Sequence, residues 1–184
     1  MQTFAVYVDN KPGVLNRVAS LFRRRAYNIE SLTVGHTEVA GLSRMTIVVD
    51  TDERGARLVE ANLYKLIPVR RVDNITRVPT IGRDLAMIKV AATGDARTQV
   101  MQLVDVYRAR IVDVSPESLV IETTGTEDKI DSLLEVLRPY GVMEMVRTGR
   151  VEMARGMTPP TPKLSARAAA ATEKRSKDTT NMSV

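Results

Sequence analysis

The sequence predicts an α+β protein built from two successive βαββαβ units. Short runs with alternating hydrophobic residues and longer runs with helical hydrophobic spacing follow one another in that order over residues 1 to 78. The same order returns over residues 84 to 156, after a short segment at 79 to 83 that reads as a linker. Connections this short favour antiparallel strands, with both helices of a unit on one face of its sheet.

The first unit begins with a strand that leads into an amphipathic helix. Phe4, Val6 and Val8 alternate on one strand face, and Leu15 and Phe22 lie on one stripe of the helix that follows. The next elements are strands at 29 to 35 and 42 to 50, a helix with apolar Val59, Leu63 and Leu66 that ends before Pro68, and a strand at 69 to 76.

The second unit repeats this order. Its helices are indicated by i, i+3, i+4, i+7 spacing in two runs, Val100, Leu103, Val104, Tyr107 and Ile130, Leu133, Leu134, Leu137. Its strands are expected at 85 to 91, 110 to 114, 119 to 123 and 142 to 147. Both units are therefore expected to be ferredoxin-like. Each leaves a sheet face or edge uncovered, which favours association into a homodimer.

The composition is that of a globular protein without redox or membrane features. The 184 residues are 43% hydrophobic, and no apolar run approaches the ~18 residues that a spanning helix needs. The chain has no Cys, which excludes disulfides and thiolate metal sites. Its first residues do not resemble a secretory signal, so we expect a cytoplasmic location and no membrane partner.

The net charge of +5 belongs mainly to the C-terminal end. Residues 155 to 184 hold six basic and two acidic side chains, whereas the other 154 residues hold 21 and 20. The segment at 157 to 184 also lacks periodic apolar residues, which predicts a disordered basic tail. Two roles remain open for it, a solubilising end or an electrostatic arm for an acidic partner. The near-neutral remainder does not indicate nucleic-acid binding.

Catalytic chemistry finds little support. The single histidine, His36, stands near a strand end, where a solvated loop position is favoured over a general base. Asp50 and Asp52 precede a helix and are suited to capping it. Residues 23 to 25 are all Arg and could suggest phosphate binding. They end a helix, however, where positive side chains complement the dipole, and this structural explanation is favoured. No nucleotide-binding glycine motif occurs. We therefore predict no catalytic residue and no metal site.

The turn at residues 9 to 15 (DNKPGVL) is the strongest candidate for a binding site. Pro12 restricts the turn, and Gly13 allows another molecule to approach the main chain closely. The first N–H groups of the following helix have no intrahelical partner, and the helix dipole adds positive potential there. The turn can therefore hold a small carboxylate, although a Pro-Gly turn before a helix is also a common plain connection.

Several of these residues carry a resemblance to a known family. The βαββαβ order with Asn10-x-x-Gly13-x-Leu15 resembles an ACT domain, the small-molecule module of amino-acid metabolism. Residues 21 to 34 (LFRRRAYNIESLTV) and 42 to 47 (LSRMTI) closely resemble the small regulatory subunit of acetolactate synthase (acetohydroxyacid synthase). The likeness extends more loosely through residues 111 to 114 and 125 to 126, and so covers about residues 2 to 156.

The resemblance implies a non-catalytic subunit of branched-chain amino acid biosynthesis. Such a subunit binds and activates the large catalytic subunit and transmits feedback inhibition by valine or another branched-chain amino acid. Thiamine diphosphate, magnesium and FAD would reside in that catalytic partner, and this chain would hold no cofactor. In the family the effector lies between ACT domains of two chains, and the corresponding residues here are Asn10, Gly13, Val14, Leu15, Asn28 and Ile29.

These residue types suit an amino acid. Main-chain amides near Gly13 can receive its carboxylate, Asn10 and Asn28 can bond its charged groups, and Leu15 and Ile29 can line an aliphatic side chain. Asn28 could equally serve only to end the helix in a left-handed conformation.

The chain departs from the family at two points. Ala26 stands where the family usually has Gly, and a positive φ at that position would cost on the order of 1 kcal/mol. The second unit has Thr93-Gly94-Asp95-Ala96 in place of the binding turn, so we assign it no amino-acid site and expect it to serve dimerisation and contact with the catalytic subunit.

The alternative interpretation is a tandem ACT-type amino-acid-sensing regulator of transcription or signalling. It is disfavoured by the near-neutral charge of residues 1 to 154 and by the lack of a helix-turn-helix pattern. A small enzyme is the third class considered.

Overall fold

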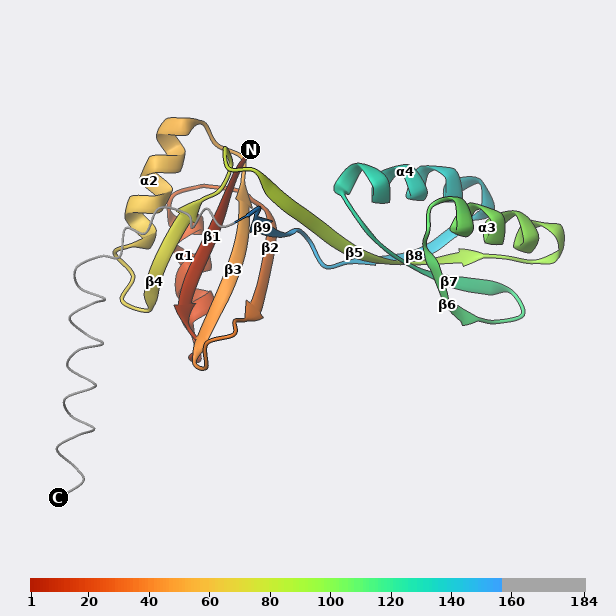
Figure 1. Cartoon of the computed structure of the whole chain (residues 1–184), viewed down its shortest axis with the longest axis horizontal. Coiled ribbons are helices and arrows are strands. Elements are labelled where there is room, and N and C mark those ends of the chain that lie inside the picture. The colour runs from red at the N-terminus through yellow and green to blue at the C-terminus, as the bar shows by residue number, and fades with distance from the viewer. Residues whose placement is uncertain (157–184) are drawn as a thin grey trace, which may run out of the picture. The chain divides into compact units, whose positions relative to one another are not determined.

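A computed structural model describes residues 1–156, and the disordered basic tail expected at 157 to 184 lies outside that range. The chain divides into two compact units. The first holds Met1–Thr80 and, of the described residues, those from Ala154 onward, and the second holds Ile81–Met153. Each unit has an antiparallel sheet and two α-helices (Figure 1). The predicted α+β class with two ferredoxin-like units is thereby confirmed.

The first unit has the expected order of elements. These are β1 (Gln2–Asp9), α1 (Val14–Arg24), β2 (Ile29–His36), β3 (Leu42–Val49), α2 (Glu53–Leu63) and β4 (Val69–Asn74). The strands form one sheet in the order β2-β3-β1-β4, so β2 and β4 are its edges. One apolar core joins both helices to the sheet and includes Phe4, Phe22, Ile47 and Val59, each at most 1% exposed.

The strand register fixes which residues share an end of this sheet. Asp9 at the end of β1 is paired with Leu42, and the next residue of β3, Ser43, is paired with His36. At the other end of β3, Val49 is paired both with Gln2 of β1 and with Ile29 of β2. The C-terminal ends of β1 and β2 therefore lie together, and the start of β2 lies at the opposite end of the sheet.

Helix α1 is enclosed by two left-handed residues. Gly13 at its N-cap has φ 79°, and Ala26 just beyond its end has φ 55°. The N–H of Ala26 donates to the Arg23 carbonyl and that of Tyr27 to the Phe22 carbonyl, both at 3.1 Å. These two bonds form a Schellman motif, which glycine usually closes. Ala26 thus adopts the positive φ whose cost was considered from the sequence.

The elements of the second unit are β5 (Thr80–Ala91), α3 (Gly94–Val106), β6 (Arg110–Val114), β7 (Ser118–Gly125), α4 (Glu127–Leu137), a 3₁₀ turn (Arg138–Tyr140), β8 (Val142–Arg147) and β9 (Val151–Ala154). The sheet order is β6-β7-β5-β8, and β9 also pairs with β5. Ile88, Val100, Ile121 and Leu133 belong to its core and are fully buried. None of the helices described in residues 1–156 is long and apolar enough to cross a bilayer.

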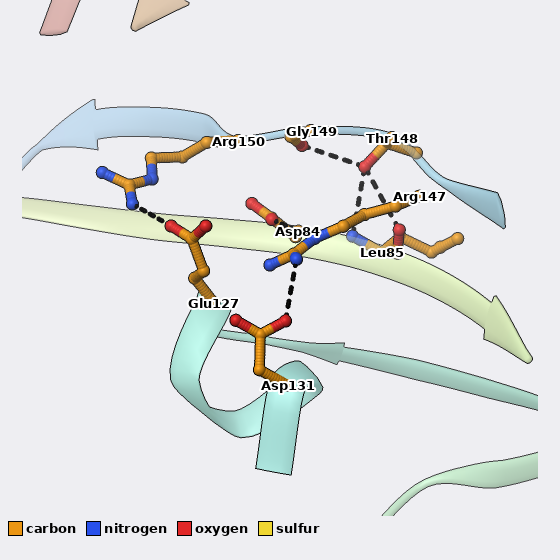
Figure 2. A network of polar contacts seen from close by, with 8 residues as sticks. All are labelled: Asp84, Leu85, Glu127, Asp131, Arg147, Thr148, Gly149 and Arg150. Carbon is orange, nitrogen blue, oxygen red and sulfur yellow. Dashed lines mark hydrogen bonds and ion pairs between the residues drawn. The ribbon is translucent and has the colours of Figure 1, made fainter. Parts of the chain in front are cut away.

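The second sheet differs from the prediction at one edge. Residues 80 to 83, expected within the linker, form the start of β5, and β9 adds a fifth strand that was not expected. Figure 2 shows the side chains that hold this edge. Arg147 donates to Asp84 at 2.8 Å and to Asp131 of α4 at 3.0 Å, while Arg150 donates to Glu127 at 2.7 Å. These ion pairs hold the end of β8 and the segment that leads into β9 against β5 and α4.

Candidate functional site

The turn between β1 and α1 is open to solvent. Asn10, Lys11, Pro12 and Gly13 are all exposed. An added Cβ at Gly13 would meet no atom within 4 Å, although its φ of 79° is one that side chains rarely adopt. Glycine is therefore required here by the backbone conformation, and it leaves open space beside the first turn of α1.

The first turn of α1 presents unpaired N–H groups. The Val14 N–H donates to the Lys11 carbonyl at a long 3.4 Å, and the first bond along the helix runs from the Arg17 N–H to the Gly13 carbonyl at 3.1 Å. Between them, the N–H groups of Leu15 and Asn16 have no partner within residues 1–156. No side chain caps this helix and no acidic residue lies in its first turn. The helix dipole and these donors are the features that suit a helix N-terminus to hold a small anion.

Asn10 is the first residue of this turn, directly after β1. Its N–H donates to the Gly41 carbonyl at 2.8 Å, which ties the turn to the loop between β2 and β3. Its side-chain Nδ2 lies 3.3 Å from Nδ1 of His36, the last residue of β2. His36, expected as a loop histidine, is thus a neighbour of the candidate site.

A charged group lies at the base of the turn. Arg70 of β4 donates to both carboxylate oxygens of Asp9, from Nε at 2.5 Å and from Nη2 at 2.9 Å. Lys11 Nζ lies 3.4 Å from the same carboxylate. The hydrogen bond from Arg70 lowers the pKa of Asp9 and outweighs the opposing effect of its partial burial. Asp9 therefore stays ionised, and the three side chains carry a net charge of about +1 beside the anion receptor.

Asn28 and Ile29 lie at the opposite end of the sheet from the turn. Asn28 precedes β2 and donates through Nδ2 to the Glu30 carboxylate, and Ile29 is the first residue of β2. Seven steps along β2, at about 3.3 Å each, separate Ile29 from His36, which is about 23 Å. A single chain therefore brings Asn10, Gly13 and Leu15 together and keeps Asn28 and Ile29 apart from them.

Val14 has a different environment from its neighbours. Its side chain is only 5% exposed and packs in the core of the first unit, whereas Leu15 is 45% exposed at the start of the same helix. Leu15 can therefore contact a ligand at the turn through its side chain. The side chain of Val14 instead packs α1 against the core of the first unit.

The βαββαβ unit with an open turn between β1 and α1 is the architecture of an ACT domain. Residues 4–71 match the family model described as the AHAS small subunit-like ACT domain, and residues 83–156 match the model described as the small subunit of acetolactate synthase. The chain belongs to the acetolactate synthase small subunit family.

Curated relatives are similar in sequence to this chain over most of their length. A probable acetolactate synthase small subunit of Archaeoglobus fulgidus is 51% identical over 154 residues, which cover 84% of this chain and 96% of the relative. The acetolactate synthase small subunit of Bacillus subtilis is 46% identical over 150 residues, which cover 81% and 87%. The crystal structure of the acetolactate synthase small subunit from Thermotoga maritima, 39% identical, superposes with a TM-score of 0.80 over 84% of this chain and 97% of that one. The resemblance noted from the sequence is confirmed.

Proposed function

We propose that this chain is the non-catalytic subunit that binds the large catalytic subunit of acetolactate synthase, raises its activity and makes it sensitive to valine or another branched-chain amino acid. The observation that carries the proposal is the uncapped N-terminus of α1, where Gly13 leaves space and the Leu15 and Asn16 N–H groups lack partners. An amino acid offers a carboxylate of the right size and charge for these donors.

A complete effector site requires two copies of the chain in this proposal. Strand β2 is an edge of its sheet within residues 1–156, and an edge strand favours addition of a second β2. Antiparallel pairing about a two-fold axis near the middle of β2 would set Ile29 of one copy opposite His36 of the other. Asn28 and Ile29 of the second copy would then lie beside Asn10 and Gly13 of the first.

Each residue then has a defined task toward the ligand. The α1 amides receive the effector carboxylate, and Asn10 orients it from the mouth of the turn. Asn28 of the second copy bonds to Glu30 through Nδ2, and its Oδ1 remains an acceptor for the effector's ammonium group. Leu15, from the first copy, and Ile29, from the second, supply apolar contact for a branched aliphatic side chain, which favours valine over a polar amino acid.

The catalytic partner supplies the rest of the chemistry. We infer that thiamine diphosphate, magnesium and FAD are bound by the large subunit and that this chain binds none of them. The second unit lacks the Asn-x-x-Gly-x-Leu turn of the first, so its proposed tasks are dimerisation and contact with the large subunit. We place the complex in the cytoplasm, with the soluble enzymes of amino-acid synthesis.

Reconstitution of the complex tests this function. The purified chain is added to the large subunit of the same organism, and acetolactate formation from pyruvate is followed across a valine titration. We expect no turnover by the chain alone, a higher rate when both subunits are present, and inhibition by valine only in the complex. Turnover by the chain alone, or a rate unaffected by its addition, would refute the proposal.

A further inference from the structure

Strand β4 contains a bulge at Arg70. Tyr7 of β1 is paired with Arg71, but the next residue, Val8, is paired with Val69, so Arg70 is an extra residue in the ladder. A bulge turns the side chain of the extra residue away from the regular alternation of the strand. Here it directs the guanidinium of Arg70 to Asp9, the last residue of β1 and the one that leads into the binding turn.

The contact between Arg70 and Asp9 has the geometry of a strong ion pair. Both oxygens of Asp9 accept a bond, at 2.5 Å from Nε and 2.9 Å from Nη2. The Asp9 side chain is only 14% exposed and that of Arg70 34%. Planar two-point pairs of this kind are stronger than single contacts, and partial burial reduces their screening by salt. Lys11, 61% exposed and 3.4 Å away, adds a weaker contact.

The position of this pair gives it a consequence for ligand binding. Asp9 lies four residues before Gly13, so a bare carboxylate there would repel the carboxylate of an amino acid bound at the N-terminus of α1. We infer that Arg70 is a positioning residue of the effector site, which neutralises Asp9 and so preserves the anion affinity of the turn. This inference rests on the proposed function, because it presumes an anionic effector at that turn.

A purely structural tether predicts a different pattern of variants. If Arg70 acts by neutralising Asp9, replacing Asp9 with Asn should make Arg70 dispensable. If the pair only holds the turn in place, the double variant should be as impaired as the single one. Arg70→Met removes the charge and keeps the aliphatic stem, and Arg70→Lys keeps the charge and loses the two-point contact. Arg77, 81% exposed and paired with Glu53, offers a control for the loss of one positive charge elsewhere.

The experiment is calorimetric titration of valine into the full chain at low and high salt, for the wild type, Arg70→Met, Arg70→Lys, Asp9→Asn, Asp9→Asn/Arg70→Met and Arg77→Met. We expect Arg70→Met to raise the Kd about tenfold at low salt and less at high salt. An uncompensated charge roughly 8 Å from the ligand changes affinity by about twofold to about thirtyfold between the dielectric limits of water and protein surface. Asp9→Asn leaves the charge of Arg70 uncompensated and should lower the Kd by a factor in the same range. The other three variants, Arg70→Lys, Asp9→Asn/Arg70→Met and Arg77→Met, should bind within about threefold of the wild type.

Each outcome decides the matter. An unchanged Kd for Arg70→Met would overturn the inference, and so would a defect in the Asp9→Asn/Arg70→Met variant. If Arg70→Met is too unstable to titrate, Arg70→Lys and the double variant still test the inference, because weaker valine binding by either one contradicts the neutralising role. Absence of valine binding by the wild type would instead refute the proposed function, and the inference with it.

Discussion

Replacement of Gly13 by Asp should free the complex from valine inhibition, and the structure allows the steric and electrostatic parts of this effect to be separated. Gly13 has φ 79° and no atom within 4 Å of an added Cβ. The side chain of any substituent would therefore enter the open space beside the α1 amides. Asp and Asn are nearly isosteric and both tolerate the left-handed conformation. Gly13→Asn is thus the matched neutral control.

The charge decides the difference between these two variants. Two carboxylates about 4 Å apart repel by about 1 kcal/mol in water and by about 4 kcal/mol near a protein surface. This corresponds to a loss of affinity between about fivefold and about 1000-fold for Gly13→Asp relative to Gly13→Asn. The backbone strain, on the order of 1 kcal/mol, is common to both variants. Activation of the large subunit should be largely preserved in both.

The assay is acetolactate formation by the reconstituted complex across a valine titration, together with the unfolding midpoint of each free chain. We expect the concentration of valine for half-inhibition to rise at least fivefold from Asn to Asp at position 13, with equal unfolding midpoints. Equal inhibition curves for the two variants would refute the placement of the effector carboxylate at this turn.

Three further predictions concern stability. Ala26→Gly should raise the free energy of unfolding by about 1 kcal/mol in urea titrations, because it relieves a positive φ of 55° in the Schellman motif; a destabilised variant would contradict this. Arg147→Met should lower the free energy of unfolding by about 3 to 5 kcal/mol, because it leaves buried Asp84 without its partner. Asp131→Asn changes a partner of Arg147 that is 56% exposed, and it should lower the free energy of unfolding by less than about 1 kcal/mol. Because the pKa of Asp9 is lowered in the folded protein, its stabilising contribution is present above about pH 4 and is lost as the pH falls through the folded pKa. Unfolding midpoints should therefore fall more steeply in acid for the wild type than for Asp9→Asn. Parallel pH profiles for the two proteins would exclude this contribution.

Much of the fold could be predicted because its signals are local. Helical spacing such as that of Val100, Leu103 and Val104, and alternation such as that of Phe4, Val6 and Val8, place most strands and helices within a few residues. Strand β9 could not be predicted in this way. It has only four residues, and it forms by pairing with β5, a strand from a distant part of the sequence. Such contacts leave no periodic trace in the sequence.

Only the local part of the candidate site could likewise be predicted from the sequence. The Pro-Gly turn and the open helix N-terminus are contiguous in sequence, so they could be proposed from it. His36 reaches Asn10 from 26 residues away and Arg70 reaches Asp9 from 61 residues away. The first contact depends on strand register and the second on a bulge, and neither is visible in the residue types alone. The sequence also did not indicate that Asn28 lies at the far end of the sheet from Gly13.

That separation provides the most direct test of the central claim, an effector site shared by two copies of the chain. Chains carrying Gly13→Asp and chains carrying Asn28→Ala are each titrated with valine, and then a one-to-one mixture is unfolded, refolded together and titrated. Each variant alone has a defect in every site. In the proposed site, loss of the Asn28 amide removes a hydrogen bond to the charged effector and should weaken binding by about tenfold to 100-fold.

In the mixture, about half of the dimers contain one chain of each kind. A mixed dimer has one site with both defects and one with none, so about a quarter of all sites should regain wild-type affinity. The account predicts this recovery. A mixture that binds no better than its two components would contradict it, because a site formed within one chain cannot be restored by exchange.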